Sequence, residues 1–356
     1  MTARLRLDLP GPELTAALCD IESVSGGEGP LADSIETALG TRAHLTVARD
    51  GDAVVARTDL GRDERVILAG HLDTVPVAGN LPVQRDGDVL RGRGTVDMKG
   101  GVAVALRLAA HVPAPNRDLT YVFYDNEEVE AAKNGLGRVA RNHPEWLAGD
   151  FAVLLEPTGS VVEGGCNGTL RVAVEVPGTR AHSARWWMGV NAIHAAGGVL
   201  DRLRAYRPAE VEVDGLVYRE GLNAVGITGG VAGNVIPDRC EVTVNYRFAP
   251  DKSVAEAVEH VRDVFDGFDV SVTDSAPAAR PGLGHPAAAS FLAAVGGTPR
   301  AKDGWTDVAR FAELGMPAVN YGPGDPLLAH HDEERVDVAE IERCEQRMRA
   351  WLAGTG

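Results

Sequence analysis

Short apolar runs alternate with amphipathic stretches in the first half of the chain and again near its C-terminus. Short runs rich in β-branched and aromatic residues predict buried strands at residues 65–70, 119–124 and 151–156. Apolar residues at helical spacing predict helices at residues 13–23, 31–39 and 100–112. The last of these is apolar almost all round, so we expect a buried helix that begins near Met98. Strands that alternate with helices predict an α/β fold with parallel strand pairs.

From about Thr169 the pattern changes to the order strand, helix, strand, strand, helix, strand. These elements are expected at residues 170–176, 191–206, 222–230, 240–249, 254–265 and 268–274. This order is that of a split βαβ, ferredoxin-like α+β domain. A Pro- and Ala-rich linker at residues 274–282 follows, and the α/β pattern then resumes. We therefore predict an inserted domain at residues 169–278 within a first domain made of residues 1–168 and 279–356.

Length and charge limit the classes of function. A chain of 356 residues is long enough for two cores. The formal net charge of −16 argues against nucleic acid or an anionic membrane as a partner, and no apolar stretch is long enough to span a bilayer. The four cysteines are scattered and form no C-x-x-C pair. We therefore expect neither a zinc knuckle nor a disulfide framework, and a cytoplasmic location fits best.

The stretch "GHLDTVP" places His71 and Asp73 at the end of a predicted buried strand. Residues i and i+2 of a strand point to the same side, so the two side chains are expected to face one way. A lone His-x-Asp pair is more often packing or a surface turn than a site. Its meaning depends on what the rest of the chain brings to it.

Further acidic and imidazole side chains follow other predicted elements. Asp97 lies in a Gly-rich turn before the buried helix, where its ordinary interpretation is a helix N-cap. Acidic residues directly follow two predicted strands, and a histidine pair lies in a loop before the last helix: Glu127, Glu128, Glu156, His330 and His331. Clustered loop charges are often only solvated surface, so each of these is weak by itself.

Together, these residues match the needs of a pair of divalent cations, namely a bridging carboxylate, further carboxylates and imidazoles. The candidate ligands are His71, Asp97, Glu128, Glu156 and His330. Glu127 then remains as a general base, and Asp73 is placed to fix the tautomer of His71. Oxygen and nitrogen ligation without thiolate favours zinc, with cobalt or manganese as possible substitutes.

The motifs "GHLDTVP", "GRGTVDMKGG", "NEEV", "EPT", "GTRAHSA" and "AHHDEERV" occur in this order. The chain therefore resembles the di-zinc family of aminoacylases, carboxypeptidases and related N-deacylases over nearly its whole length. Within that family, the stretches "FYDNEEVEAAKNGLGR" and "GWTDVARFAELGMPAVNYGPGDPLLAH" are most similar to the actinobacterial succinyl-diaminopimelate desuccinylases. The fold implied is a zinc-peptidase-like catalytic domain with a central mixed sheet, plus an inserted dimerisation or lid domain.

The resemblance implies a role for each matched residue. One zinc would be bound by His71, Asp97 and Glu156, and the second by Asp97, Glu128 and His330, so that Asp97 bridges the pair. Glu127 would act as general base and then acid, while Asp73 would orient His71. His330 is chosen over His331 because its distance from "ERV" keeps the family spacing.

The inserted domain would contribute residues that bind the substrate. His182 matches a family histidine that crosses the dimer to the scissile carbonyl oxygen. Arg247, Asn234 and Thr306 match positions that hold substrate carboxylates. The sequence departs from the family at Asn126, where an acid is frequent, and at the Trp305–Thr306 pair.

The activity implied is hydrolysis of N-succinyl-LL-2,6-diaminopimelate to succinate and LL-2,6-diaminopimelate, a precursor of lysine and of cell-wall cross-links. The alternative is a related di-zinc N-deacylase or peptidase, such as an acetylornithine deacetylase, which would keep the ligands and change the pocket. We expect a homodimer formed through the inserted domain, with residues 170–176 or their partners as an edge strand or a helix face that needs covering.

Overall fold

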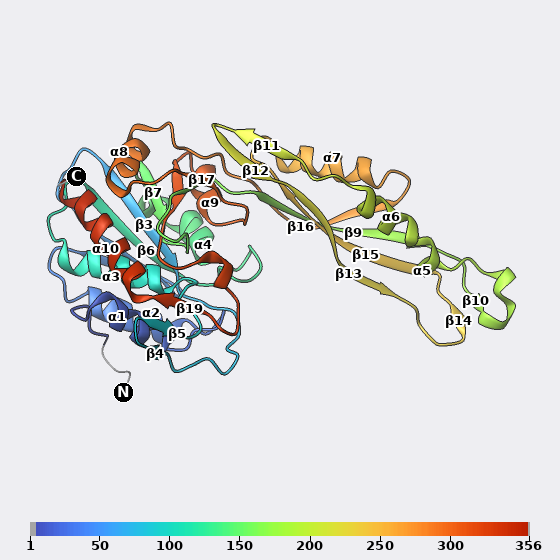
Figure 1. Ribbon diagram of the computed structural model, residues 1–356, viewed down its shortest axis with the longest axis horizontal. Helices are drawn as coiled ribbons and strands as arrows, with labels where there is room; N and C mark the ends of the chain where they lie inside the picture. The colour runs from blue at the N-terminus through green and yellow to red at the C-terminus, as the bar shows by residue number, and fades with distance from the viewer. Residues whose placement is uncertain (1–4, 355–356) are drawn as a thin grey trace. The chain divides into compact units, whose positions relative to one another are not determined.

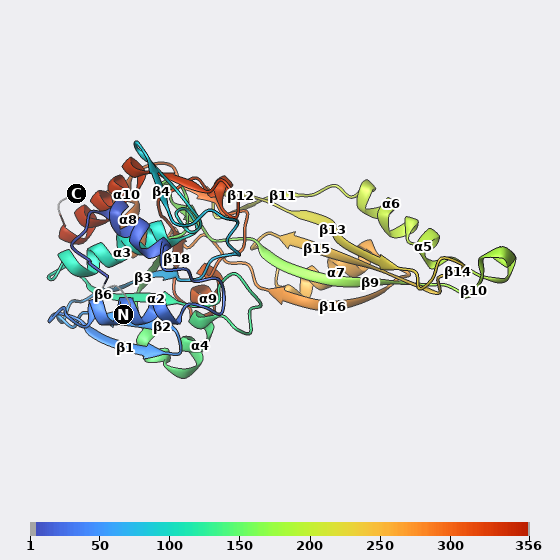
Figure 2. The same cartoon turned by 90° about the horizontal axis from the view of Figure 1, so that it is seen from below.

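The computed structural model describes residues 5–354, drawn in Figures 1 and 2. The chain divides into two compact units. The first contains the described residues up to Gly164, Pro281–Arg300 and those from Arg310 onward. The second contains Gly165–Arg280 and Ala301–Ala309. The short segment 301–309, which sequence analysis assigned to the first domain, thus groups with the second unit.

The first unit is built on a mixed sheet with the strand order β1-β2-β6-β3-β7-β18-β8-β17. Its strands are β1 (Thr46–Asp50), β2 (Ala53–Arg57), β3 (Arg65–His71), β6 (Asp118–Tyr124), β7 (Phe151–Leu154), β8 (Glu163–Gly164), β17 (Arg300–Ala301) and β18 (Ala318–Asn320). Strand β3 runs parallel to both of its neighbours, β6 and β7, and β18 runs parallel to β7. Because these strands are parallel, their carboxyl ends meet at one edge of the sheet.

Helices cover the sheet because alternate side chains of its strands are apolar on both faces. One core joins Leu68 and Phe123 of the sheet to the apolar sides of α1 (Gly11–Cys19), α2 (Gly29–Leu39), α3 (Lys99–His111), α8 (Pro286–Val295) and α10 (Val338–Ala353). Helices α1, α3 and α10 pack against one another (Figure 1). Helix α4 (Gly135–Asn142) contacts β2 and β6.

The remaining elements of this unit are short. They are β4 (Gln84–Asp86), β5 (Val89–Arg91) and β19 (Arg335–Asp337), which form a small sheet, with η1 (Pro144–Leu147), α9 (Val308–Glu313) and η3 (Pro326–Leu328). One glycine brings α3 close to the sheet. A Cβ atom at Gly101 would lie only 2.0 Å from the carbonyl oxygen of Leu155, so only glycine lets the first turn of α3 approach the end of β7.

The second unit is an antiparallel sheet with the strand order β13-β15-β9-β16. Its strands are β9 (Gly168–Pro177), β13 (Gly221–Gly229), β15 (Arg239–Phe248) and β16 (Asp269–Ala276). Helices α5 (Ala192–Ala195), α6 (Gly197–Ala205) and α7 (Val254–Val264) contribute to a core with one face of β9 and β15. The small elements are β10 (Ala181–His182), η2 (Ser183–Met188), β11 (Glu210–Val213), β12 (Leu216–Arg219) and β14 (Val235–Ile236).

Of the alternatives expected for the edge of the second sheet, residues 170–176 themselves are excluded, because they lie in β9, which is paired on both sides with β15 and β16. The two edges are β16, a direct partner of β9, and β13. On β13, Val225 is 60% exposed and Ile227 is 54% exposed. No helix among the described residues has both the length and the apolar character needed to cross a membrane.

Candidate metal and catalytic site

Three neighbouring parallel strands of the first unit end in chemistry-bearing residues. His71 is the last residue of β3, the turn 125–128 follows β6, and Glu156 comes two residues after β7. The strands are short, mostly apolar and, apart from Arg65, buried, and the candidate residues lie where each strand leaves the core. Parallel pairing brings these three ends together.

Asp97 approaches the same edge from the turn before α3. The N-cap of α3 is Met98, without a side-chain cap bond, so Asp97 is not serving the ordinary capping role. Its two oxygens instead point to different imidazoles. Oδ1 lies 3.1 Å from Nε2 of His71, and Oδ2 lies 3.3 Å from Nε2 of His330. A carboxylate with each oxygen facing a separate histidine has the geometry of a bridging ligand.

Two groups of possible ligand atoms share Asp97. One is His71, Asp97 and Glu156, and the other is Asp97, Glu128 and His330. Within each group the nitrogen and oxygen atoms all lie within 4.8 Å of one another. The donors are imidazole nitrogen and carboxylate oxygen, a set that suits zinc, cobalt or manganese in a hydrolytic centre. These residues therefore fit a pair of divalent cations.

A third group contains His71, Glu127 and Glu128. The carboxylate of Glu127 thus lies beside the ligand atoms, at the position expected of a base that acts on a molecule held there. Distance alone does not separate a base from a ligand at this position. The metal content of a Glu127 variant separates them.

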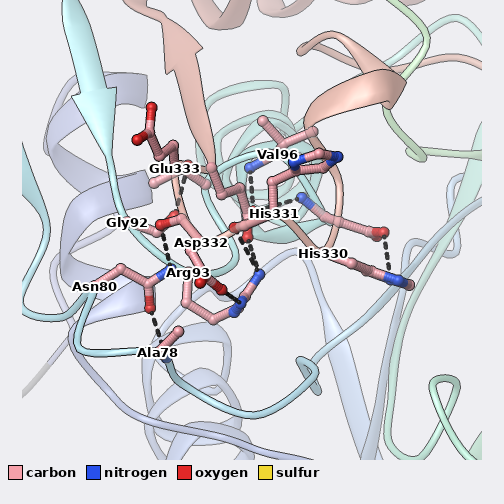
Figure 3. Close-up of polar contacts among 12 residues, drawn as sticks. Ala78, Asn80, Gly92, Arg93, Val96, His330, His331, Asp332 and Glu333 are labelled. Atoms are coloured by element: carbon pink, nitrogen blue, oxygen red, sulfur yellow. Dashed lines mark hydrogen bonds and ion pairs between the residues drawn. The ribbon is translucent and has the colours of Figure 1, made fainter.

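Of the two adjacent histidines, only His330 lies in a ligand group. Its Nε2 is 2.9 Å from Oε1 of Glu128, and its backbone φ of 65° is in the left-handed region. The side chains of His330 and His331 point in different directions (Figure 3). His331 contributes its backbone oxygen, which accepts a hydrogen bond of 3.2 Å from Arg93.

A buried ion pair ties the His330 loop to the Asp97 turn. Arg93 Nη1 donates to Glu334 Oε2 at 3.0 Å, and the two side chains are 3% and 1% exposed. The other oxygen of Glu334 accepts the backbone N–H groups of Val96 at 2.9 Å and Asp97 at 3.1 Å. In Figure 3, the Arg93 side chain lies beside the loop that contains His331 and Asp332. This pair fixes the spacing of the two ligand segments.

Asp73 is fully buried and contacts both His71 and the turn after β6. His71 Nδ1 lies 3.0 Å from the backbone oxygen of Asp73 and 3.6 Å from its Oδ1. The Asp73 carboxylate accepts the backbone N–H groups of Glu127 and Glu128, each at 3.0 Å. Asp73 therefore holds the turn that carries the base, in addition to lying beside His71.

The carboxylates control the protonation of the two imidazoles. Burial lowers the pKa of His71, but the hydrogen bond and charge of Asp97, with Asp73 nearby, outweigh it and raise that pKa well above its usual value. Hydrogen bonds with Asp97 and Glu128 raise the pKa of His330 to about 10. Burial raises the pKa of Asp97, but its bonds to the two histidines outweigh this and hold that pKa below its usual range.

In the second unit, His182 and Asn234 lie near one another. Strands β10 and β14 pair His182 with Val235, and Ser183 donates its N–H to the backbone oxygen of Asn234 at 2.9 Å. His182 is exposed, and its Nδ1 accepts a hydrogen bond of 3.1 Å from the backbone N–H of Ala184. That bond leaves Nε2 as the ring nitrogen that can carry a proton outward.

Arg247 and Thr306 also belong to the second unit. Arg247 is half-buried near the end of β15, opposite Thr169 of β9. Its guanidinium has no ion pair among the described residues, and burial together with the charge of Arg171 lowers its pKa. Thr306 is 4% exposed, and its backbone oxygen lies 3.7 Å from the Sγ atom of Cys166.

Sequence analysis did not single out four residues that contact this site. Ser25 and Glu28 hydrogen-bond to the Asp73 carboxylate and to the turn after β6, while Arg93 and Glu334 form the buried pair. A partial signal existed for the first two, because a Ser and a Glu flank the Gly-Gly pair of "SGGEG" just before a helix. No local pattern identifies the second pair, whose members are 241 positions apart.

The sequence profile of peptidase family M20/M25/M40 matches residues 67–353. A Mycobacterium tuberculosis protein whose name assigns it provisionally as a succinyl-diaminopimelate desuccinylase is 59% identical over 98% of this chain and 100% of its own. A Corynebacterium glutamicum succinyl-diaminopimelate desuccinylase is 46% identical over 98% of each chain.

Solved structures match the fold. A Staphylococcus aureus tripeptidase has a TM-score of 0.79 at 20% identity and covers 99% of both chains. A Bacillus subtilis dinuclear metal binding peptidase of the M20 family has a TM-score of 0.71 at 18% identity and covers 97% of both chains. The expected fold class and the expected family are thereby confirmed. The chain belongs to peptidase family M20/M25/M40.

Proposed function

We propose that this chain is a metal-dependent amide hydrolase that converts N-succinyl-LL-2,6-diaminopimelate to succinate and LL-2,6-diaminopimelate. The observation that carries the proposal is the pair of ligand groups that share Asp97, with Glu127 beside them. This arrangement occurs in a chain that matches two desuccinylases over 98% of its length. The second product, LL-2,6-diaminopimelate, is a precursor of lysine and of cell-wall cross-links.

The cofactor is a pair of divalent cations, with zinc preferred and cobalt or manganese as substitutes. His71, Asp97 and Glu156 would hold one, and Asp97, Glu128 and His330 would hold the other. When bound, the cations polarise the scissile carbonyl and make a water molecule acidic near neutral pH.

Glu127 moves the proton. Its carboxylate takes a proton from the water that attacks the succinyl carbonyl carbon, and the C–N bond then breaks. Glu127 gives the proton to the nitrogen of the leaving amine. The Asp73 carboxylate holds the backbone N–H of Glu127 and so limits where this base can lie.

His182 donates a hydrogen bond to the developing oxyanion from a second copy of the chain. Within one chain, His182 lies beyond one end of β15, whose first residue is Arg239, and Arg247 lies near the other end. Arg239 and Arg247 are eight positions apart along the strand, roughly 26 Å at about 3.3 Å per residue. One small substrate cannot reach both sites in one copy, which supports a homodimer.

The exposed strand β13 is the element best suited to join two copies. It is an edge with unpaired backbone groups on one side and apolar Val225 and Ile227 exposed. Pairing with the same strand of a second copy follows the self-complementary geometry of twofold dimers. An interface of this kind covers the apolar side chains and gives the backbone N–H and C=O groups of the edge strand hydrogen-bond partners.

The substrate carboxylates are held by Arg247 and Thr306 of one copy and by Asn234 of the second copy, since Asn234 lies beside His182. The Arg247 guanidinium is half-buried without an ion pair in the described part of the chain, which suits an anionic ligand group. The partner is thus a small N-succinylated amino acid, with no role for nucleic acid or membrane. A reducing cytoplasm fits the four cysteines, which are unpaired and buried.

The second candidate is a related N-deacylase or peptidase, since such an enzyme keeps the same ligand groups. Kinetics with zinc on N-succinyl-LL-2,6-diaminopimelate, N-acetylornithine and a tripeptide separate them. We expect kcat/KM for the succinylated substrate to exceed the others by roughly two decades or more, because unpaired buried polar groups penalise the wrong substrate. A higher kcat/KM for N-acetylornithine or the tripeptide would overturn the substrate assignment.

A further inference from the structure

The turn that carries Glu127 and Glu128 is held by two buried carboxylates from other parts of the chain. Three successive backbone N–H groups of the turn point to them. Glu28 Oε1 accepts from Asn126 at 3.0 Å, while Asp73 accepts from Glu127 and Glu128 at 3.0 Å each. Both carboxylate side chains are 0% exposed.

Glu28 belongs to a loop, residues 23–28, that lies along the end of β3. Ser23 Oγ donates to the backbone oxygen of Leu72 at 2.6 Å, and a parallel bridge joins Val24 to Thr74. Ser25 Oγ donates to Oδ2 of Asp73 at 2.7 Å. The 23–28 loop therefore reaches the turn after β6 both directly and through Asp73.

The turn is in a conformation that needs such support. Asn126 has a φ of 58°, in the left-handed region that few residues other than glycine adopt and that Asn tolerates best. Its side chain donates to Oδ2 of Asp125 at 2.7 Å. This conformation and this hydrogen bond suit an Asn at a position where the family frequently has an acid, and they make the position of Glu127 depend on the contacts of the turn.

We propose that Ser25 and Glu28 are positioning residues, which fix the backbone of the turn 125–128 and thereby the place of the base Glu127. The 23–28 loop lies outside residues 67–353, the part that the family profile matches. The role of Glu127 rests on the proposed function, whereas the backbone restraint does not. Glu28 acts through the Asn126 N–H, and Ser25 acts through Asp73.

A matched control exists at the other end of β6. Asp118 is 3% exposed and accepts the backbone N–H groups of Leu60 at 2.8 Å and Arg62 at 2.9 Å. It is a buried carboxylate that holds a loop, as Glu28 is, but it lies at the amino end of the strand. Replacement of Asp118 is expected to lower the stability of the fold without moving Glu127.

The experiment compares Glu28→Met, Glu28→Gln, Ser25→Ala and Asp118→Leu in the zinc-loaded full chain. Hydrogen exchange measured by mass spectrometry follows the amides of residues 126–128 and of residues 60–62. Steady-state kinetics and metal content are measured on the same samples. Met keeps the volume of Glu28 without an acceptor, whereas Gln keeps one acceptor oxygen.

In Glu28→Met we expect faster exchange at 126–128, and a kcat lower by roughly ten- to a hundredfold with KM and zinc content retained. Glu28→Gln should recover most of that loss, and Ser25→Ala should show a smaller change of the same kind. Asp118→Leu should speed exchange at 60–62 only. If Glu28→Met unfolds, Ser25→Ala carries the test.

Unchanged exchange at 126–128 in Glu28→Met and Ser25→Ala would overturn the proposal, as would a kcat loss in these two variants no larger than that of Asp118→Leu. A wild-type chain without activity on the succinylated substrate would instead refute the proposed function. The exchange data would then still decide whether the 23–28 loop restrains the turn. The two failures are therefore distinguishable.

Discussion

The two units place their candidate residues in opposite ways. In the first, parallel β3, β6 and β7 all end at one edge, so residues more than 80 positions apart, His71 and Glu156, have ligand atoms within 4.8 Å. In the second, the strands are antiparallel, and His182 and Arg247 lie toward opposite ends of the sheet. Parallel strands therefore gather the candidate ligands within one chain, whereas the antiparallel unit separates its candidate residues, which is why the proposed function assigns them to two copies.

The largest effect is expected for Asp97→Ala, because Asp97 is common to both ligand groups. We expect about two zinc ions per wild-type chain and loss of both in the variant, with activity at background. Metal analysis of the purified chains, with Glu130→Gln as a surface control, checks this. Normal binding of two metals by Asp97→Ala would show that the sheet edge formed by the carboxyl ends of β3, β6 and β7 is not the metal site.

Much of the first unit is predictable from sequence because its buried strands are continuous apolar runs. The two hairpins at residues 46–57 and 84–91 were missed, although each carries an Asp-Gly dipeptide at its turn. Their strands are short and mixed with charge, so periodicity alone is weak there.

The site is predictable to the extent that ligands follow strands. His71 and Glu156 stand directly at strand ends, and local pattern is enough to nominate them. The residues that hold the ligand-bearing segments in place do not lie near those segments in the sequence. The Arg93–Glu334 pair and the Glu28–Asn126 bond join segments that are far apart, and only the folded chain shows that they meet.

Glu127→Gln is expected to lower kcat by roughly three decades, because it removes the base while keeping the shape of the side chain. Zinc content should stay at the wild-type level, which separates a base from a ligand. If Glu127→Gln loses both its activity and its zinc, Glu127 is instead a metal ligand. Retention of a tenth of the wild-type rate would remove its role altogether.

His182→Ala tests the dispersed arrangement of the second unit. Removing an oxyanion donor costs about 3 kcal/mol, a factor of hundreds in kcat, and no metal should be lost. Mixing this variant with an excess of Glu127→Gln chains should restore activity, because one site of the mixed dimer then has both groups intact. Mixed dimers that form without restored activity would contradict a role across two copies.

Metal binding at the carboxyl ends of β3, β6 and β7 should depend on pH. Asp97 and Glu128 raise the pKa of His330 to about 10, and Asp97 raises that of His71, so a cation must displace a proton from each. The affinity for the pair of cations should therefore fall as the pH is lowered below the pKa values of the two histidines, by up to roughly two decades per pH unit. Binding of the pair should release about two protons. Calorimetry in buffers of different ionisation enthalpy measures that number. Binding without proton release would contradict the ligand roles of the histidines.

The smallest expected effect concerns Arg247, which lies far along the second sheet from His182. Arg247→Ala should lower kcat/KM by roughly ten- to a hundredfold, since a hydrogen bond to a charged group contributes about 1.5–3 kcal/mol. The loss should appear mainly in KM, because a substrate carboxylate is held equally before and during reaction. Arg171, on the same face of the neighbouring strand and 51% exposed beside Asp274, is the matched control. If Arg171→Ala raises KM as much as Arg247→Ala does, the effect is one of general positive charge, and a specific carboxylate contact at Arg247 is excluded.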